Sequence, residues 1–585
     1  PENFNWDDCL GLQTRTWNIV RTTSTRLYVL ETIQYDDDTT GDGVLDNNSY
    51  MITRPNFYEI RTYDVNDVDG DGVANDIDLF PIDAADWVDF DGDGVGDNAD
   101  TDADNDGVID SADTFPLNPT ESLDTDADGI GNSADSDDDN DGVSDTWSIA
   151  QLGADIDGES AGDLAGRLAL SGDGTTLAVG SWGANSYTGL VRIFKWDVAS
   201  VGWIQQGTSI LGESASDYSG YSISLSDDGS VVAIDSSGAN SNGAMGGYVR
   251  VFEWNGQDWI QRGANIAGES EGDWCCYNSL SADGATIAVG AQRSAGSDNL
   301  VDSGQTRVLS WNGTDWIQKG SKIDGEAAND RSGRYATKLS SDGLSLAIGA
   351  RLNDGNGNDS GHVRVYKWAA GSWVQRGQDI DGESAGDLSG NSVSLSSDGG
   401  LVAIGAPGND GAGDGAGHVR VYGWSDATLN WVQRGQDIDG EVATCVEGAA
   451  YSDSDGDGVI DTCGDESGWA SHLSSDGSTL SISAWKNDGN GKDSGHTRLY
   501  SWDEPSQLWV QSGSDIDGEA AGDHSGYQTS VSSDGSIIAV GAWGNIGTLG
   551  YSQAGHVRVF KLGAPSDAFP LDASETTDTD SDGVG

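Results

Sequence analysis

The chain has little positive charge and a large excess of negative charge. Its 585 residues include 28 Lys and Arg against 98 Asp and Glu, which gives a formal charge of -70. So acidic a surface repels polyanions and argues against nucleic acid as a partner. Self-repulsion on this scale opposes a compact fold, so the acidic parts must either be disordered or bind cations.

Long apolar runs and methionine are also scarce. No run approaches the about 18 residues that span a bilayer, and no signal-like segment follows Pro1, so we expect the chain to begin at a mature or trimmed end. The chain has only 2 Met but 85 Gly, 21 Trp and 17 Tyr. Such a composition is typical of short strands joined by tight turns and predicts an all-β fold.

Cysteine is limited to five residues. Cys445 and Cys463 bracket a short acidic insertion and suit a disulfide, which predicts an oxidising compartment. Cys275 and Cys276 are adjacent and Cys9 stands alone, so buried thiols, free thiols and disulfides all remain open for them.

The acids of one segment fall on a regular grid. Residues 64 to 145 contain 28 Asp or Glu and no Lys or Arg. Positions one, three, five, six, nine and twelve of four loops carry Asp67, Asp69, Asp71, Gly72, Asn75 and Asp78; Asp89, Asp91, Asp93, Gly94, Asp97 and Asp100; Asp102, Asp104, Asp106, Gly107, Asp110 and Asp113; and Asp124, Asp126, Asp128, Gly129, Asn132 and Asp135. A fifth loop has Asp137, Asp139, Asp141, Gly142 and Asp145, and a degenerate one has Asp38, Asp42, Gly43 and Asp46.

This spacing predicts calcium sites, several ions in all. Oxygens at positions one, three and five wrap a hard cation, and the glycine permits the sharp turn. A Val or Ile follows each of these glycines and is expected to form a minimal core. A disordered acidic linker is the alternative, but random acidity would not repeat the glycine and the apolar residue. The loops resemble bacterial thrombospondin type 3 repeats.

A longer repeat supports the same prediction. Asp-x-Phe-Pro occurs at 78–81, 113–116 and 567–570, each time shortly before an acidic loop. The third copy leads into Asp578, Asp580, Asp582 and Gly583. We therefore expect a second calcium-binding array to start at 564–585 and the natural protein to continue beyond Gly585.

A second kind of repeat follows the array. A Gly-Glu pair recurs at Gly158, Gly212, Gly268, Gly325, Gly382, Gly440 and Gly518. Seven units of this length predict a seven-bladed β-propeller over 147–563. Each unit has an Asp-Gly turn after its first strand, at Asp173, Asp228, Asp283, Asp342, Asp398, Asp476 and Asp534, which predicts a tight hairpin.

Tryptophans mark two strands of each unit. Six end the third strand (Trp196, Trp254, Trp311, Trp368, Trp424 and Trp502), and seven open the fourth (Trp147, Trp203, Trp259, Trp316, Trp373, Trp431 and Trp509). We expect these to be core residues. Unit seven lacks a fourth strand of its own, so residues 147–153 are predicted to supply it and close the ring.

The units resemble FG-GAP repeats, the blades of the integrin α-subunit propeller, with Gly405, Ala406 and Pro407 at the GAP position. The family's calcium loop between the first two strands has shrunk here to Ser-x-Asp-Gly. Unit six carries an insertion at 445–463 with a calcium loop of Asp453, Asp455, Asp457, Gly458 and Asp461. Asn- and Asp-rich segments after the second strands, such as 353–359 and 487–493, are more often plain turns, and metal binding there is the alternative.

Two patterns that suggest catalysis are interpreted as structural. The G-x-S-x-G pattern at 158–162, 268–272 and 382–386 recurs in a β repeat without the helix that a nucleophile elbow requires. His362, His418, His496 and His556 share a repeat position that holds Leu190, Tyr248 and Gln305 elsewhere. An arginine two residues later in all seven units is expected to pair with a repeat carboxylate or stack on a tryptophan.

These features predict four regions: a partial β domain or assembly segment at 1–63, the calcium array at 64–146, the propeller at 147–563 and the second array at 564–585. We expect no enzyme activity. The expected function is that of a secreted, calcium-binding structural or adhesive protein of a microbial cell surface or matrix, forming a fibre or a longer chain with copies of itself or with matrix components. A monomeric ligand- or glycan-binding adhesin is the alternative, and an enzyme with an unrecognised site is the weakest.

Overall fold

The computed structural model describes residues 13–22, 27–35, 62–63, 67, 69, 72–132, 135, 148–441 and 464–563, except 242, 297, 505, 548, 549 and 551. Two compact units divide the chain near residue 143. In the described residues the only helix is the single turn α1 (Ala184–Tyr187). No helix of this part of the chain is long and apolar enough to cross a membrane.

The first unit contains a small sheet and a series of turns. Strands β1 (Gln13–Thr22), β2 (Leu27–Tyr35) and β3 (Thr62–Tyr63) form an antiparallel sheet in that order. The strands fall within the segment predicted to be β. Residues 72–132 contain turns and bends without regular strands or helices.

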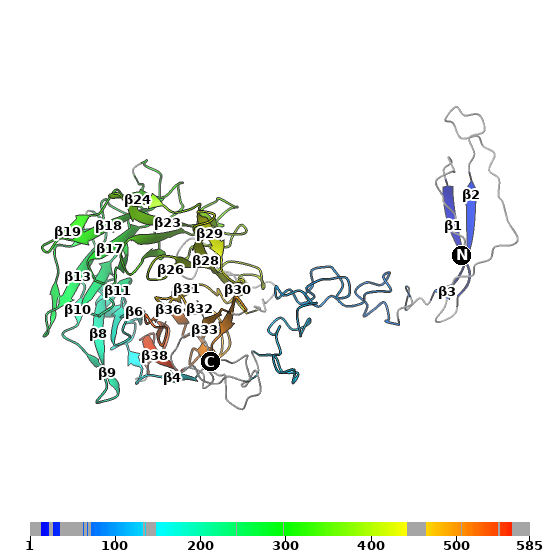
Figure 1. Ribbon diagram of the computed structural model, residues 1–585, viewed down its shortest axis with the longest axis horizontal. Helices are drawn as coiled ribbons and strands as arrows, with labels where there is room; N and C mark the ends of the chain where they lie inside the picture. Colours follow the sequence, from blue (N-terminus) through cyan, green and yellow to red (C-terminus); the bar gives the residue numbers. More distant parts are fainter. Residues whose placement is uncertain are drawn as a thin grey trace. The chain divides into compact units, whose positions relative to one another are not determined.

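The second unit is a seven-bladed β-propeller, as predicted from the repeats (Figure 1). Each blade has four antiparallel strands and a two-residue strand that pairs with the start of the third. In chain order the first three blades are β6 (Ala165–Leu170), β7 (Thr176–Ser181), β8 (Leu190–Asp197), β9 (Gly202–Gln205) and β10 (Ile210–Leu211); β11 (Ile223–Leu225), β12 (Val231–Ser236), β13 (Tyr248–Trp254), β14 (Trp259–Gln261) and β15 (Ile266–Ala267); and β16 (Cys275–Leu280), β17 (Thr286–Ala291), β18 (Gln305–Trp311), β19 (Trp316–Gln318) and β20 (Ile323–Asp324).

The other four blades repeat this plan. They are β21 (Thr337–Leu339), β22 (Ser345–Ala350), β23 (His362–Ala369), β24 (Ser372–Gln375) and β25 (Ile380–Asp381); β26 (Ser392–Leu395), β27 (Leu401–Ala406), β28 (His418–Ser425), β29 (Asn430–Gln433) and β30 (Ile438–Asp439); β31 (Ala470–Leu473), β32 (Thr479–Ala484), β33 (His496–Asp503), β34 (Leu508–Gln511) and β35 (Ile516–Asp517); and β36 (Ser525–Val531), β37 (Ile537–Ala542), β38 (His556–Gly563), β4 (Ser148–Gln151) and β5 (Ile156–Asp157).

The ring closes through the strand that enters the domain. Strand β4 pairs with β38, as predicted, and Ile149 lies opposite Leu562. The corresponding pair in blade one is Trp196 and Trp203. The prediction that Trp147 opens this strand is therefore wrong, because the register gives its place to Ile149. Blade seven replaces the tryptophan pair with two aliphatic residues.

The Asp-Gly turns form hairpins with four-residue loops. In blade one the Ser171 N–H donates to the Thr176 carbonyl at 2.8 Å, so residues 172–175 form the turn. The Ser171 hydroxyl and the Thr175 N–H both donate to Asp173. Gly174 has a φ of +66°, which glycine adopts without strain.

Tryptophans of the repeats pack within and between blades. The prediction that they are core residues is confirmed for the buried Trp259, Trp316, Trp431 and Trp509, whereas the other described repeat tryptophans are only partly buried. Six third- and fourth-strand pairs pack with ring centroids 5.3 to 5.5 Å apart. Each fourth-strand indole also donates to a carbonyl of the preceding repeat, as from Trp431 to Arg376 at 2.8 Å and from Trp509 to Arg434 at 3.0 Å. A buried carbonyl thereby gains a partner across the blade interface.

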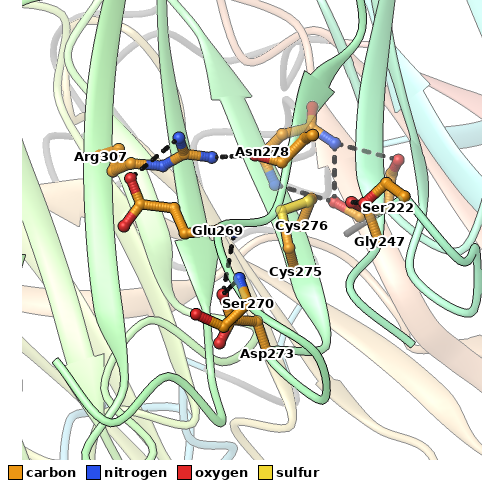
Figure 2. The surroundings of a disulfide bond; sticks show 11 residues. Ser222, Gly247, Glu269, Ser270, Asp273, Cys275, Cys276, Asn278 and Arg307 are labelled. Atoms are coloured by element: carbon orange, nitrogen blue, oxygen red, sulfur yellow. Dashed lines mark hydrogen bonds and ion pairs between the residues drawn. A yellow bond between two sulfur atoms is a disulfide. The ribbon is translucent and has the colours of Figure 1, made fainter. Parts of the chain in front are cut away.

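Strand β16 begins with a disulfide between Cys275 and Cys276, whose state the sequence left open. Figure 2 shows it near the ion pair of Arg307 and Glu269 and the hydrogen bond from Asn278 to Ser222. Both cysteines are fully buried. The predicted disulfide of Cys445 and Cys463 and the loop at Asp453, Asp455, Asp457 and Asp461 lie outside the described residues.

Candidate functional site

The four acidic loops share one hydrogen-bonding scheme. The position-six glycine N–H donates to the position-one carboxylate at 3.1 to 3.2 Å, in the pairs Gly72 to Asp67, Gly94 to Asp89, Gly107 to Asp102 and Gly129 to Asp124. All four glycines have φ between +92° and +102°, a conformation that favours glycine. The loops therefore curl so that their alternate side chains converge.

Backbone amides orient the inner carboxylates. In the second loop the Asp93 N–H donates to Asp91 at 2.9 Å and the Val95 N–H donates to Asp93 at 2.7 Å. The third and fourth loops repeat both bonds. Each bond occupies one oxygen of a carboxylate, and in Asp91 and Asp104 the second oxygen is buried without a hydrogen bond.

Position nine has a different role. Asp97, Asp110 and Asn132 each accept a hydrogen bond from the position-two N–H, at 2.8 to 2.9 Å. One oxygen of each of these side chains is therefore committed to closing the loop. The remaining oxygen of Asp97 or Asp110 is still able to reach an ion, directly or through water.

Several inward-facing carboxylate oxygens are buried without a hydrogen bond. Within the described residues these include oxygens of Asp102, Asp104 and Asp113 in the third loop, and of Asp78, Asp91 and Asp124 in the others. They belong to positions one, three and twelve of the grid. A buried anionic oxygen without a partner is costly, so these sites fit a bound cation.

Electrostatics in the third loop lead to the same conclusion. Burial, and then the charges of Asp104, Asp113 and Asp102, raise the pKa of Asp106 to about 6. Burial and the charge of Asp113 likewise raise the pKa of Asp104. Oxygen-only ligands with several negative charges are the donor set that calcium prefers, and calcium would neutralise this repulsion.

The structure describes some of the predicted calcium ligands and not others. One oxygen each of Asp89, Asp91 and Asp93 lies within 4.8 Å of the others. Asp100 ends the second loop, and Asp102 begins the third two residues later. The other predicted ligands that the structure describes are Asp69, Asn75, Asp126, Asp128 and Asp135. Asp71, Asp137, Asp139, Asp141 and Asp145, and Asp38, Asp42 and Asp46, lie outside the described residues.

The prediction that the Val or Ile after each glycine forms a small apolar core is wrong for two of the loops. Val95 is 41% exposed and Ile130 is 47% exposed. The buried residues include Asp86 and Glu121, at 4% and 7% exposed, and Ala103, at 3%. Asp86 accepts hydrogen bonds from the Asn98 and Ala99 N–H groups. Segments this short cannot cover an isoleucine, so they are organised by polar contacts instead.

Repeat residues of the propeller that suggested chemistry have structural partners. The third-strand arginines pair with the glutamate of the preceding Gly-Glu motif, as in Arg364 with Glu326 at 3.3 Å and Arg420 with Glu383 at 3.0 Å. The carboxylate alternative of the prediction is thus confirmed for these arginines. In the first G-x-S-x-G copy the Ser160 N–H donates to Asp163, and the chain continues into strand β6. The turn at 353–359 is held by its own side chains, with the Gly355 N–H donating to Asn353.

A central cavity of about 250 Å³ was not predicted. The first strands of the blades line it, so it combines residues hundreds of positions apart. Arg167 lies over the rings of Tyr221 and Tyr527, 3.9 and 4.5 Å from the centroids. Lys338 lies 3.3 Å from the His472 ring. No sequence motif marks this set, because each residue stands alone in its own repeat.

Comparisons with known proteins add little about function. No protein-family model and no curated protein sequence matches the chain. Similar solved structures include putative 6-phosphogluconolactonases from Bacteroides fragilis NCTC 9343 (TM-score 0.38, 12% identity, 60% of this chain and 83% of that one) and Bacteroides uniformis ATCC 8492 (TM-score 0.36, 14% identity, 60% and 84%). TolB from Acinetobacter baumannii is another (TM-score 0.30, 15% identity, 51% and 66%). Likeness at this level says nothing about activity.

Proposed function

We propose that this chain is a secreted, calcium-binding structural or adhesive protein of a microbial cell surface or matrix. The buried carboxylate oxygens without hydrogen bonds in the acidic loops are the observation that carries the proposal. The net charge of -70 supports it, because a compact chain of this charge needs bound cations. The calcium ions would set the order of residues 64–145.

The proposed role is non-catalytic. The G-x-S-x-G copies form turns that lead into strands, and the repeat arginines pair with repeat glutamates. A rigid propeller that follows a calcium-ordered segment in the chain suits a structural or adhesive role better than catalysis. The proposed partners are copies of the same chain or other matrix components, in a fibre or a larger multidomain protein.

Calcium titration of the full chain tests the calcium sites. We expect Asp91→Asn to remove one calcium ion, or to weaken one site at least about tenfold, because position three supplies a charged ligand. Asp76→Asn is the matched control, since exposed Asp76 lies off the grid and the charge change is the same. Equal titrations for both variants and the natural chain would contradict the assignment.

The assembly role has its own test. Electron microscopy of the native surface, before and after chelation, is expected to show a fibre or sheath that contains this protein and loosens without calcium. A compact monomer at millimolar calcium, with no such material on the surface, would reject the fibre and leave a simple adhesin.

The central cavity favours a second candidate, a ligand-binding adhesin. Arg167 is buried, and its Nε and one terminal nitrogen have no hydrogen bond within the described part of the chain. Tyrosine rings beside a guanidinium can contact a small polar ligand such as a sugar acid. Arg167→Met would abolish glycan-array binding if this candidate holds and leave adhesion unchanged if it does not.

A further inference from the structure

Four of the seven blades begin their third strand with a buried histidine. His362, His418, His496 and His556 are each 1% exposed. Blades one to three have Leu190, Tyr248 and Gln305 there, so the fold itself does not require an imidazole. A chemical reason for the histidine has to come from its surroundings.

The register places two aspartates beside each of these histidines. His362 pairs with Asp381, and Asp379 lies two residues earlier in the same segment and thus on the same face. The other three blades repeat the pattern with Asp437 and Asp439, Asp515 and Asp517, and Asp155 and Asp157.

Blades without the histidine also lack the complete acid pair. The corresponding residues are Ser209 and Leu211 in blade one, Asn265 and Ala267 in blade two, and Lys322 and Asp324 in blade three. The complete set of one histidine and two aspartates therefore occurs in four blades. Blade three has only Asp324, and blades one and two have none of the three residues. Residues that change together across repeats indicate one shared task.

A third carboxylate comes from the preceding blade. His362 Nδ1 lies 4.0 Å from Glu326, 3.8 Å from Asp379 and 4.0 Å from Asp381. His418 Nδ1 lies 3.8 Å from Asp437 and 3.7 Å from Asp439. The groups that offer ligand atoms within 4.8 Å of one another are Glu326, His362 and Asp379; Glu383, His418 and Asp437; Glu441, His496 and Asp515; and Asp155, Asp157 and His556.

The separations at His362, His418 and His556 are too long for hydrogen bonds, whereas His496 Nδ1 lies 3.2 Å from Asp515. A hydrogen bond between nitrogen and oxygen needs about 3 Å. Two ligand atoms about 2.1 Å from one metal lie about 3.0–3.5 Å apart at adjacent positions, so an ion would draw these carboxylates about 0.5 Å closer to the imidazole. In the described residues neither ring nitrogen of buried His556 has a hydrogen-bond partner, although Nδ1 faces Asp155 at 3.8 Å and Glu519 at 3.9 Å.

A glutamine of the fourth strand orients the first aspartate of the cluster through a hydrogen bond that recurs in several blades. Gln375 Nε2 donates to Asp379 Oδ1 at 2.6 Å, and it is Oδ2 that faces His362. Gln151 and Gln511 hold Asp155 and Asp515 in the same way, at 2.7 and 2.8 Å. Outer hydrogen bonds of this kind orient the first ligands of metal sites.

Blade three has a lysine, Lys322, at the repeat position that Asp379 occupies in blade four. Lys322 forms an ion pair with Glu269, and Gln305 donates to Asp324 at 2.7 Å. Each histidine cluster instead has three carboxylates and one arginine, for example Arg364 with Glu326, which leaves about two negative charges. The position thus requires a positive charge, which blade three supplies with a lysine.

We propose that blades four to seven each bind a divalent transition-metal ion through a histidine Nδ1, two aspartates and the glutamate of the preceding blade. Imidazole with carboxylates is a donor set for zinc, manganese or cobalt, whereas calcium takes oxygen ligands. The carboxylates are 16 to 48% exposed, which gives an ion a path from solvent. Each ion links two adjacent blades, and the ion at His556 links the last blade to Asp155 and Asp157 at the entry of the domain.

Zinc titration of the full chain in millimolar calcium tests this proposal, with calcium keeping the acidic loops filled. We expect four zinc equivalents that disappear in the quadruple His→Gln variant at 362, 418, 496 and 556, and the loss of one equivalent in each single variant. Glutamine is the residue that blade three has there, so the fold should survive. His524→Gln is the control and should lose none, since His524 stacks on Trp543.

X-ray absorption at the zinc edge provides the second readout. It should show one imidazole nitrogen among oxygen ligands and lose that signal in the quadruple variant. The proposal is overturned if the four histidine variants bind as much zinc as the natural chain, or if the bound zinc has oxygen ligands only. The calcium titration of Asp91→Asn is independent, so the two proposals can fail separately.

Discussion

Individual carboxylates of the propeller differ in pKa according to their partners. Burial raises the pKa of Asp235 to about 7, although this carboxylate accepts a hydrogen bond from the Ser222 N–H. Asp228, at a hairpin turn, is exposed, and hydrogen bonds from Ser226 and Ser230 outweigh the effect of desolvation and lower its pKa. The first group favours folding when protonated and the second when ionised.

Asp235→Asn should therefore stabilise the propeller at higher pH. Between about pH 4 and pH 7 the folded chain keeps a proton that the unfolded chain has lost, so the wild-type contribution falls as pH rises. Asparagine does not titrate and keeps an oxygen for the Ser222 N–H. Denaturant unfolding should show a gain on the order of 1–3 kcal/mol at pH 8 relative to pH 5.

Asp228→Asn is expected to change the stability of the folded chain in the opposite direction to Asp235→Asn. It removes a stabilising ionised group, so we expect it to destabilise the chain at pH 7, by an amount that shrinks as the pH falls below the ordinary pKa value of 3.8. If both variants followed the wild-type pH dependence in parallel, these assignments would be wrong.

The closing strand β4 joins segments more than four hundred residues apart. Its Ile149 packs against the cluster that contains Val531 and Leu562, whereas Ile204 of blade one is 52% exposed on the corresponding strand. The two isoleucines thus allow the same substitution at a packed and an exposed position.

We expect Ile149→Ala to lower the free energy of unfolding by about 1–3 kcal/mol. Ile204→Ala should change it by less than about 0.5 kcal/mol. Equal effects in denaturant unfolding of the two variants would show that β4 does not hold the ring closed.

Local patterns in the sequence predicted much of this fold. The Gly-Glu period, the Asp-Gly turns and the repeated tryptophans predicted seven blades, and the missing fourth strand predicted the closure. The register of β4 was missed because Trp147 resembled the tryptophans of the other blades, while Ile149 occupies their place. The acidic grid predicted a sharp turn at the position-six glycines, but their hydrogen bonds to the position-one carboxylates were not predicted.

Features that depend on contacts between blades could not be predicted. The central cavity combines Arg167 and Tyr527 from the first strands of two blades with Tyr221, which precedes the first strand of a third. The histidine clusters were interpreted as structural because Glu326 and His362 are separated in the chain and come together only through the register of the short strands. Without that register, a histidine that is absent from three repeats looks dispensable.

For the whole molecule, we expect the negative charge to couple the order of the acidic loops to bound metal ions. The acidic loops have little apolar material inside them, so their order depends on polar contacts and on neutralising the carboxylates. The propeller has a buried apolar core between every pair of adjacent blades, so we expect it to keep its order without calcium. Removal of calcium should therefore affect the two units very differently.

Hydrogen exchange of the full chain, with calcium and with a chelator, tests the calcium-dependent order of the acidic loops most directly. With calcium, peptides that contain the amides of Gly94, Gly107 and Gly129 should exchange at least about tenfold more slowly than after chelation, because these amides donate to position-one carboxylates. Peptides from strands β7, β17 and β27 should exchange equally in both conditions. Equal exchange of the loop peptides with and without calcium would contradict the account.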